Sequence, residues 1–422
     1  MRSFSEILKR IERKEAVVLT SKEVCDLVSS DQKEKLLEVD VVTSATRAIM
    51  SGTYAILSFH VAEPGSFRSA NSVELNGIPG FVGPCPNENL GIVDLIIYGT
   101  SHALSQPNYG GGHLFRDLVE QKSVHIEVRT NENKLLAKEI TLDDMPHANL
   151  FGSRHAFKNY SAFVNSSDKP IDTIFHVRPF EPECQSATFS GCGQINPIKN
   201  DPYLETIGVG TRILLNGAEG FVLGKGTRSS LDKPNLAGFA DMHKMNPEYM
   251  GGFMTSAGPE CICSWAVPIP VINPSILEEI ARLDQEIPLP VMDVISRKCL
   301  SIADYGQVWN GADLKVEFSS EDCLKCTQCR VERICPLGAV DSQGESTERD
   351  EQKCFNCGAC ITECTGGAFR CNLGSIRIFD KYIPVNLRQS DRLRANKLAE
   401  DLKEKILDGS FKIAPAVERI SF

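Results

Sequence analysis

The sequence predicts a mixed α/β or α+β large domain that is interrupted, close to its C-terminal end, by a small cysteine-rich domain. Three observations predict this arrangement. Residues 1–317 mix helical and β-type apolar spacing, a cysteine repeat occupies residues 323–364, and residues 373–422 are too few to bury a core of their own. We therefore expect residues 1–317 and 373–422 to form one domain, with residues 318–372 as the insertion.

Within the large domain, apolar residues at helical spacing predict helices over residues 4–13 and 274–284. Short apolar runs predict strands at VVLTS, VDVVTSA and LGIVDLIIYGTS. The run GTRILLNGAEGFVLG predicts a hairpin, because Asn-Gly at 216–217 between two β-type runs is a strong turn signal. WAVPIPVIN carries Pro268 and Pro270, so it predicts an edge strand or an extended loop rather than a central strand.

The C-terminal segment predicts one hairpin and one helix. SIRIFDKYIPVN has the pattern of a strand pair, and an apolar stripe then predicts a helix that begins at Ser390 and ends at Gly409. We expect this segment to pack back on residues 1–317.

Composition and charge exclude several classes of protein. Hydrophobic residues make up 42% and charged residues 24%, which is ordinary globular usage and excludes a disordered chain, a collagen and a coiled coil. The net charge of −10 argues against non-specific nucleic-acid or anionic-membrane binding. The N-terminus lacks the apolar core of a signal peptide, and no run approaches the roughly 20 apolar residues of a membrane span. We therefore expect a cytoplasmic protein with no nucleic-acid or membrane partner.

The sixteen cysteines are unusual, because nine of them lie between Cys323 and Cys371. Disulfide scaffolds of this density are small secreted domains, whereas clustered cysteines in a reducing compartment more often bind metal. The pattern is C-x2-C-x2-C-x5-C-P followed by C-x2-C-x2-C-x3-C-T. Three cysteines at this spacing direct three thiolates at three iron atoms of a 4Fe-4S cubane. The alternative is two zinc sites, but zinc uses paired C-x2–4-C motifs and has no role for the third cysteine.

This repeat resembles that of bacterial-type two-cluster ferredoxins over residues 318–372. In those proteins each cluster takes its fourth ligand from the other half of the repeat. The resemblance implies two 4Fe-4S clusters, the first held by Cys323, Cys326, Cys329 and Cys364 and the second by Cys354, Cys357, Cys360 and Cys335. It also implies one-electron transfer at low potential. The first half has five residues where the usual run has three, and Thr365 stands where proline is usual.

The remaining chain carries a second resemblance, in the segments VDVVTSATRAIMSGTYAILSF, YGGGHLFRDLV, SRHAFKNYSAFVNSSD, NDPYLETIGVGTRILLNGAEG and LAEDLKEKILDGSFKI. These segments resemble the homocysteine-biosynthesis domain of archaeal L-aspartate semialdehyde sulfurtransferases. Such a domain joined to a ferredoxin pair resembles the family called methanogenesis marker sixteen. The resemblance covers most of residues 1–317 and resumes at 373–422, in agreement with an inserted domain.

The resemblance implies reductive sulfur insertion into a small metabolite. A sulfur donor, either sulfide or a persulfide, would add to the aldehyde of aspartate semialdehyde, and two electrons would reduce the adduct to the thiol of homocysteine. The clusters would pass these electrons on from an external electron donor. The sulfurtransferases carry a cysteine directly after the methionine of the first motif, whereas Ser51 follows Met50 here. The sulfur carrier of those relatives is therefore missing, and the substrate can differ.

Three other cysteines are candidate catalytic thiols. Cys192 is flanked by two glycines, so the backbone there can approach a ligand closely; the alternative is a small residue in a tight loop. Cys261 and Cys263 are alternate residues whose thiols point the same way on an extended chain; the alternative is simple burial. Cys85 lies between prolines in an expected fixed turn and is a further candidate.

The candidate substrate-binding residues are Gly110, Gly111, Gly112, His113 and Arg154. Free amides in a glycine turn at a helix start can hold a carboxylate or phosphate, although triple glycine also makes a flexible loop. His113 is a candidate acid or base, or else an ordinary hydrogen-bonding residue. Arg154 is a candidate carboxylate clamp because its guanidinium binds in bidentate fashion; a surface ion pair is the alternative.

Three functional hypotheses follow from these patterns. The first is an iron-sulfur enzyme that inserts sulfur into a small metabolite. The second is an accessory protein of methanogenesis that delivers electrons or sulfur to a partner protein during cofactor assembly, which the absence of a cysteine at Ser51 favours. The third is a plain electron carrier whose large domain serves only for docking.

Overall fold

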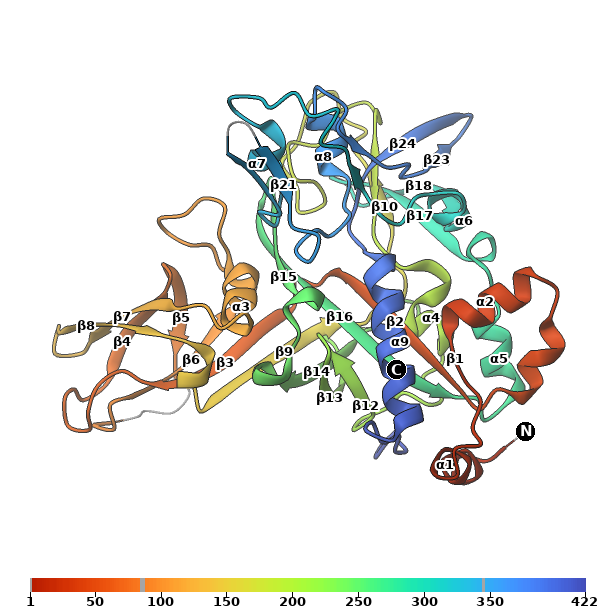
Figure 1. Cartoon of the computed structure of the whole chain (residues 1–422), viewed down its shortest axis with the longest axis horizontal. Coiled ribbons are helices and arrows are strands. Elements are labelled where there is room, and N and C mark those ends of the chain that lie inside the picture. The colour runs from red at the N-terminus through yellow and green to blue at the C-terminus, as the bar shows by residue number, and fades with distance from the viewer. Residues whose placement is uncertain (1, 84–87, 344–345) are drawn as a thin grey trace.

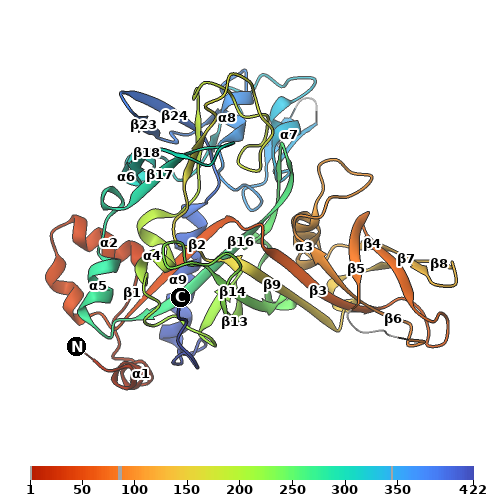
Figure 2. The same cartoon turned by 180° about the vertical axis from the view of Figure 1, so that it is seen from behind.

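The computed structural model describes residues 2–83, 88–343 and 346–422. A long sheet forms the body of the molecule and extends on one side as a wing of strands, while the C-terminal helix crosses its middle (Figure 1). The cysteine-rich segment lies on the opposite side of the body from the N-terminal helix. Figure 2 shows from behind how the first strands run from the body into the wing.

The largest sheet combines strands from the first 270 residues: β1 (Val18–Thr20), β2 (Val41–Ile49), β3 (Thr53–His60), β4 (Ala70–Leu75), β5 (Ile78–Val82), β6 (Ile92–Tyr98), β7 (Val124–Thr130), β8 (Leu135–Ile140), β9 (His147–His155), β12 (Arg212–Leu215), β13 (Ala218–Lys225), β14 (Leu236–Asp241), β15 (Gly251–Thr255) and β16 (Gly258–Pro270). Their order is β1-β2-β16-β12-β13-β14-β9-β3-β6-β5-β4-β7-β8, with β15 also paired to β16. β2 and β16 therefore lie side by side in the body, and β3 leads into the wing.

The hairpin predicted at residues 216–217 is confirmed. β12 and β13 pair antiparallel on either side of Asn216 and Gly217, whose φ angles of 51° and 85° are those that a two-residue hairpin turn of the primed type requires. This turn explains why an Asn-Gly pair occurs there.

The predicted edge position of the proline-containing strand is wrong for part of its length. β16 lies between β2 and β12, so it is a central strand. β12 pairs with Trp265 and Ala266 of β16, whereas Pro268 and Pro270 pair with β2 alone. Each proline therefore faces a partner strand on one side only, which is the arrangement that a missing N–H group allows.

Helices cover the body of this sheet: α1 (Phe4–Glu12), α2 (Ser21–Ser29), α3 (Gly111–Val119), α4 (Pro197–Asn200), α5 (Pro274–Ile280) and α9 (Arg392–Asp408). The short helix α6 (Gly306–Trp309) instead packs on strands of a second sheet. Asp391 caps the first turn of α9, one residue after the predicted start at Ser390, and Gly409, with φ of 84°, ends the helix as the sequence predicts. The apolar face of α9, with Leu398 and Leu402, packs on Ala45 of β2. Within the described ranges, no helix is long and apolar enough to span a bilayer.

A second sheet brings distant parts of the chain together. It consists of β10 (Ala162–Val164), β11 (Ala187–Phe189), β17 (Pro288–Asp293), β18 (Cys299–Asp304), β23 (Ser375–Ile378) and β24 (Lys381–Arg388) in the order β18-β17-β10-β11-β24-β23. The predicted strand pair of the C-terminal segment is the hairpin β23–β24, and β24 pairs in parallel with β11. The C-terminal segment thus contributes to both the second sheet and the cover of the first.

The cysteine-rich segment consists of two halves with the same order of elements. β19 (Glu317–Phe318), α7 (Arg330–Ile334) and β20 (Val340–Gln343) form the first half, and β21 (Ser346–Arg349), α8 (Ala359–Glu363) and β22 (Phe369–Arg370) form the second. β19 pairs with β22, β20 pairs with β21, and α7 packs against α8. The internal symmetry of the sequence repeat is therefore also present in the backbone.

Candidate functional site

A small cavity lies at the end of β2, where residues 50–52 turn into β3. Its volume is about 90 Å³, which suits a metabolite of a few carbon atoms rather than a large cofactor. Side chains that line it include the polar Ser51, Arg154, Ser190 and Gln389 and the aromatic Phe157, Tyr160 and Phe175. The cavity thus combines the serine at the relatives' cysteine position with the predicted carboxylate clamp.

A buried chain of hydrogen bonds fixes the turn that carries Ser51. Trp265 Nε1 donates to His155 Nδ1 at 2.9 Å, so the other ring nitrogen of this histidine carries the proton and donates to Thr53 Oγ1 at 2.7 Å. The Thr53 hydroxyl in turn donates to Met50 O at 2.7 Å. Burial lowers the pKa of His155 to about 3, so the ring stays neutral and this chain persists at neutral pH.

The turn also needs a glycine. A Cβ atom on Gly52 would lie 2.8 Å from Ser153 Oγ and 2.9 Å from Arg154 N, so a larger residue would push the end of β9 away. Gly52 therefore allows Arg154 to approach the Ser51 turn closely.

Arg154 is half-buried, and aromatic rings hold it in place. Its guanidinium carbon lies 5.7 Å from the ring centroid of Phe157 and 5.8 Å from that of Tyr160, within the range of cation–π attraction. Its Nε atom is buried and has no hydrogen-bond partner, and no carboxylate among the described residues pairs with it. The predicted alternative of a surface ion pair is therefore not observed, and the arrangement favours a bound anion.

The predicted glycine motif starts α3 but has few free donors. Gly111 N donates to Ser101 O at 2.8 Å and Gly112 N donates to Gly99 O at 2.9 Å, while Gly110 N donates to His113 Nδ1 at 3.2 Å. A Cβ atom on Gly111 would lie 2.1 Å from a backbone oxygen. Close packing of α3 on the sheet explains these glycines, and the structure gives no support to an anion site there.

His113 connects α3 to the cysteine-rich segment. Its Nδ1 accepts from Gly110, so Nε2 carries the proton and donates to Pro336 O at 3.1 Å. Burial lowers the pKa of His113, which keeps the ring neutral in this role. The structure thus favours the ordinary hydrogen-bonding alternative for His113 over acid–base chemistry.

Cys192 is fully buried beside β2. Its thiol lies 3.6 Å from Thr46 Oγ1 and 3.7 Å from Arg47 O, and burial raises its pKa. Ser190 of the same loop lines the cavity, whereas Cys192 is not among the lining residues. A catalytic role for Cys192 stays a prediction, since a buried thiol of raised pKa is a poor nucleophile as it stands.

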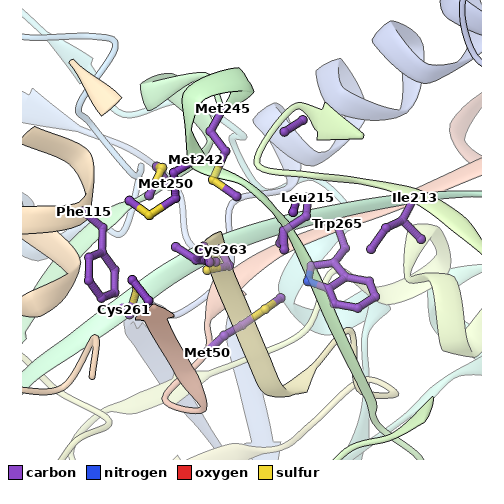
Figure 3. Close-up of a cluster of buried hydrophobic side chains, with 14 of the residues drawn as sticks. Met50, Phe115, Ile213, Leu215, Met242, Met245, Met250, Cys261, Cys263 and Trp265 are labelled. Atoms are coloured by element: carbon purple, nitrogen blue, oxygen red, sulfur yellow. The ribbon is translucent and has the colours of Figure 1, made fainter. Parts of the chain in front are cut away.

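Cys261 and Cys263 face the same side of β16, as their spacing predicts. That side is a sulfur-rich core that also contains Met50, Met242, Met245 and Met250 (Figure 3). Both thiols are fully buried, and a hydrogen bond with Cys263, together with burial, raises the pKa of Cys261 well above its ordinary value. Their catalytic role also stays a prediction, and the surroundings favour packing. Cys85 lies outside the described residues.

Four cysteines, which we call the outer quartet, surround a cavity of about 200 Å³ in the cysteine-rich segment. They are Cys323, Cys326, Cys329 and Cys364, the same four that the ferredoxin resemblance assigns to one cluster. Leu324, Val331 and Phe369 complete the apolar part of the lining. Ala368 N donates to Cys364 Sγ at 3.4 Å, a contact that favours a thiolate.

The other four cysteines, Cys335, Cys354, Cys357 and Cys360, form an inner quartet. Burial raises the pKa of Cys360, and the three other thiols of this quartet, which are close enough to act on it, raise it further. Ala339 N donates to Cys335 Sγ at 3.3 Å, so the fourth cysteine of each half receives an equivalent backbone hydrogen bond. Within residues 2–83, 88–343 and 346–422, no three His, Cys, Asp or Glu side chains form a group suited to one metal ion. A cubane does not need such convergence, because each thiolate binds a separate iron atom.

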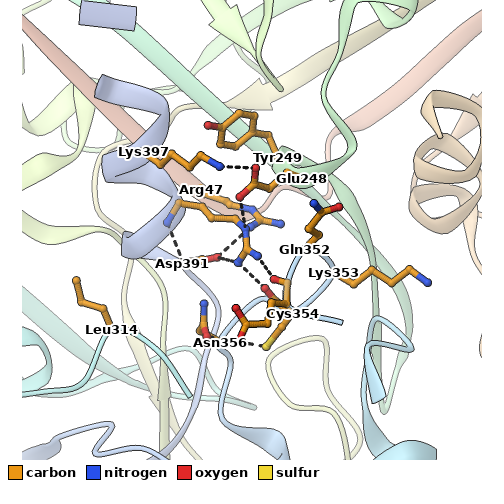
Figure 4. Close-up of polar contacts among 12 residues, drawn as sticks. Arg47, Glu248, Tyr249, Leu314, Gln352, Lys353, Cys354, Asn356, Asp391 and Lys397 are labelled. Atoms are coloured by element: carbon orange, nitrogen blue, oxygen red, sulfur yellow. Dashed lines mark hydrogen bonds and ion pairs between the residues drawn. The ribbon is translucent and has the colours of Figure 1, made fainter. Parts of the chain in front are cut away.

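A buried polar network joins the inner quartet to the large domain. Arg47 of β2 pairs with Asp391 at 2.9 Å, and Arg394 of α9 contacts both Asp391 Oδ2 at 3.1 Å and Cys354 O at 2.6 Å (Figure 4). The guanidinium of Arg47 also lies 5.2 Å from the ring centroid of Phe355. Because buried charges require paired geometry, this network fixes the loop of residues 354–357 against β2 and α9.

Ile49 and residues 388–389 connect the inner quartet to the cavity at Ser51. Ile49 lines this cavity and also packs into the cluster that contains Phe355 and Cys357. The backbone makes the same connection, since Ile49 N donates to Gln389 O at 3.2 Å and Arg388 N donates to Cys357 O at 2.9 Å. The two sites that the sequence predicts separately are therefore neighbours.

Two groups of the site were not predicted. Phe157 and Tyr160 lie in the quoted motif SRHAFKNYSAFVN, but nothing in the sequence indicates that their rings hold Arg154. Gln389 follows the C-terminal hairpin at a distance of more than 330 residues from Ser51, so its place in the cavity depends on the second sheet. For Phe157 and Tyr160, the only sequence signal is that they lie in the same motif as Arg154.

Comparison with known proteins agrees with these observations. The profile of the family described as "Homocysteine biosynthesis enzyme, sulfur-incorporation" matches residues 16–413. An uncharacterized protein of Methanothermobacter thermautotrophicus is 46% identical over 411 residues, covering 97% of this chain and 94% of that protein. A second uncharacterized protein, from Methanocaldococcus jannaschii, is 43% identical over 401 residues, which cover 95% of this chain and 100% of that protein.

An L-aspartate semialdehyde sulfurtransferase of Methanocaldococcus jannaschii is 32% identical over 363 residues, which cover 81% of this chain and 68% of the relative. No solved structure matches the chain significantly. The matched residues 16–413 include the cavity, both quartets and most of the C-terminal segment. The chain therefore belongs to the family of homocysteine biosynthesis enzymes that incorporate sulfur.

Proposed function

We propose that this protein is an iron-sulfur enzyme that reductively inserts sulfur into a small carbonyl metabolite bound in the cavity at Ser51 and Arg154. The observation that carries the proposal is that Ile49 both lines this cavity and packs on the apolar cluster that contains Cys357 of the inner quartet. An electron-transfer centre so close to a substrate cavity would allow direct reduction of a bound adduct. Membership of a family of sulfur-incorporating enzymes supports the sulfur-insertion part of the proposal.

The donor set fits a pair of 4Fe-4S clusters. Each quartet contains four thiols from two separate loops, and the outer quartet surrounds a cavity with an apolar lining. Each also has one thiol that accepts a backbone N–H bond, as cluster-ligating sulfurs do. When bound, the clusters would supply electrons one at a time from an external donor.

The residues of the cavity have distinct roles in this proposal. Arg154 would bind the substrate carboxylate, because its guanidinium has no other anionic partner among the described residues and is held by aromatic rings. Ser51 would hydrogen-bond the carbonyl oxygen. The reaction is balanced as aldehyde plus hydrogen sulfide giving thioaldehyde and water, followed by two electrons and two protons giving the thiol.

The sulfur donor would be sulfide, or a persulfide from outside the protein whose outer sulfur is first released as hydrogen sulfide by two further electrons and two protons. Ser51 offers a hydroxyl where the sulfurtransferases carry a thiol, so the cavity itself holds no sulfur nucleophile. Sulfur would therefore enter with the donor rather than from a resident persulfide in this cavity.

The test is a reaction with anaerobically reconstituted protein, sulfide, a chemical reductant and aspartate semialdehyde. We expect about eight iron atoms per chain and homocysteine formation that depends on both protein and reductant. The matched control is Cys357→Ser, which removes an inner ligand. Zinc in place of iron, or no thiol product from this or related aldehydes, would overturn the proposal.

The serine at position 51 favours a second candidate, an accessory protein that delivers electrons or sulfur to a partner during cofactor assembly. Such a protein would turn over no small molecule alone. An anaerobic pull-down distinguishes the two: a stoichiometric partner with no homocysteine formation supports the accessory role, and activity of the isolated protein contradicts it.

A further inference from the structure

A buried carboxyl group, that of Glu260, lies behind the Ser51 turn. β16 and β2 are antiparallel, and Ile262 pairs with Ile49. Glu260 precedes Ile262 by two residues and Ser51 follows Ile49 by two, so the register brings these two side chains together on one face. Glu260 is only 4% exposed.

The face that carries Glu260 is the one directed at the inner quartet. Ile262, which points to the same side as Glu260, packs with Phe253, Phe355 and Cys357, and Phe253 is paired with Glu260 across β15 and β16. Cys261 and Cys263, which alternate with these residues along β16, point to the other side of the strand, into the sulfur-rich core. Glu260 therefore lies on the side of β16 that faces the inner quartet, close to the Ser51 turn.

No cation compensates this carboxyl group among the residues that the structure describes. Its Oε2 atom is buried and has no hydrogen-bond partner. Burial raises the pKa of Glu260 to about 7, and the nearby hydroxyl of Ser51 opposes this rise only in part. The charge of Glu260 also acts on the neighbouring thiol of Cys261, whose pKa it raises. A buried acid without a counter-ion keeps its proton more easily than an exposed one.

We propose that Glu260 and Ser51 form a proton relay, in which the Glu260 carboxyl passes a proton through the Ser51 hydroxyl to the substrate in the cavity. This inference rests on the proposed function, because it needs a substrate at Ser51. Glu260 is not among the lining residues of the cavity, so it acts through Ser51 as a positioning residue rather than on the substrate directly.

The proposed reduction needs a source of protons at the substrate, and the relay would supply one. Reduction of a thioaldehyde to a thiol takes up two electrons and two protons, and the electrons arrive from the external donor through the clusters. One proton would pass from Glu260 to the Ser51 oxygen while the Ser51 proton moves to the substrate, and the second proton would come from solvent. The carboxylate that remains is then reprotonated from solvent before the next turnover.

The first test uses Glu260→Gln, which keeps the shape of the side chain and removes the transferable proton. We expect kcat for thiol formation to fall about 100-fold, the range of general acid catalysis, while KM for the aldehyde changes little because Arg154 is intact. Ser51→Ala should have the same effect, and the double variant should be no slower than either single variant. Glu127→Gln on the exposed face of β7 is the matched control.

The second test is independent of activity. Infrared difference spectra between neutral and alkaline solution should show a protonated carboxyl band that disappears in Glu260→Gln and remains in Glu127→Gln. Unchanged kcat in Glu260→Gln, or an effect on KM alone, would overturn the relay, and so would the absence of the band. If the unaltered protein forms no thiol product but shows the band, the proposed function fails, and the relay fails with it as a catalytic device.

Discussion

The inner and outer quartets derive from one sequence repeat, but their surroundings differ. Cys326 of the outer quartet is exposed, and this quartet lines a cavity that only residues of the cysteine-rich segment surround. Cys357 of the inner quartet is 8% exposed and packs against Phe253 and Ile262 of the large domain. The same local motif therefore has two environments, and under the proposed function this asymmetry gives electron flow a direction, from the outer to the inner quartet.

The strongest test of this asymmetry removes one ligand from each quartet. We expect Cys357→Ser to abolish thiol formation with every reductant, because the inner centre is the one beside the cavity. Cys326→Ser should abolish activity with a protein electron donor but retain it with dithionite, which can reach the inner centre directly. Iron content and the electron paramagnetic resonance spectrum of the reduced protein report which centre each variant lacks. Equal losses with dithionite would mean that the quartets do not differ in this way.

Aromatic residues beside the two quartets should differ in their contribution to stability. Phe355 is 1% exposed and its ring lies 5.7 Å from that of Phe253, so Phe355→Ala should lower the free energy of unfolding by about 3–5 kcal/mol. Phe318 beside the outer quartet is partly exposed, so Phe318→Ala should lower the free energy of unfolding by only about 1–2 kcal/mol. Anaerobic denaturant titration of both variants measures the difference, and equal values would contradict the tighter packing of the inner side.

Substitution of Arg154 tests whether the cavity beside the inner quartet is the substrate site. Loss of a charged hydrogen bond corresponds to about 1.5–3 kcal/mol, so Arg154→Ala should raise KM for a carboxylate-bearing aldehyde by about 10- to 100-fold. Arg154→Lys should recover part of this loss. The control is Arg212→Ala, since Arg212 already pairs with Glu219. If steady-state kinetics show the same KM for both alanine variants, the substrate does not bind at Arg154.

The smallest effects are expected from the thiols that belong to neither quartet. Cys263→Ala should lower the free energy of unfolding by about 1 kcal/mol, because it removes one buried sulfur atom, and should change thiol formation less than twofold if the thiol serves packing. Ser51→Cys should instead create a reactive thiol in the cavity. Mass spectrometry after exposure to a persulfide donor should find added sulfur on residue 51 of that variant. Persulfide on Cys263 of the unaltered protein would reverse this assignment.

Local signals predicted several elements correctly. The Asn-Gly turn at 216–217 and the helix that ends at Gly409 depend on backbone preferences of a few neighbouring residues, and both are confirmed. Pro268 and Pro270 predict an edge strand or an extended loop, whereas the first part of this strand is central, because a proline constrains hydrogen bonding only at its own position in a sheet. Such a rule cannot tell how far a strand extends beyond the proline.

The sequence by itself determined the cysteine repeat and the family, because cysteine spacing within short loops and long motifs are local properties. Only the tertiary structure decided which thiols face the large domain, that Arg154 and Ser51 share a cavity, and that Glu260 lies behind that turn. These relations join β2, β9, β16 and residues 354–357 through sheet register and side-chain packing. Contacts between residues so distant in the chain leave no periodic pattern in the sequence, since each depends on how the whole sheet is assembled.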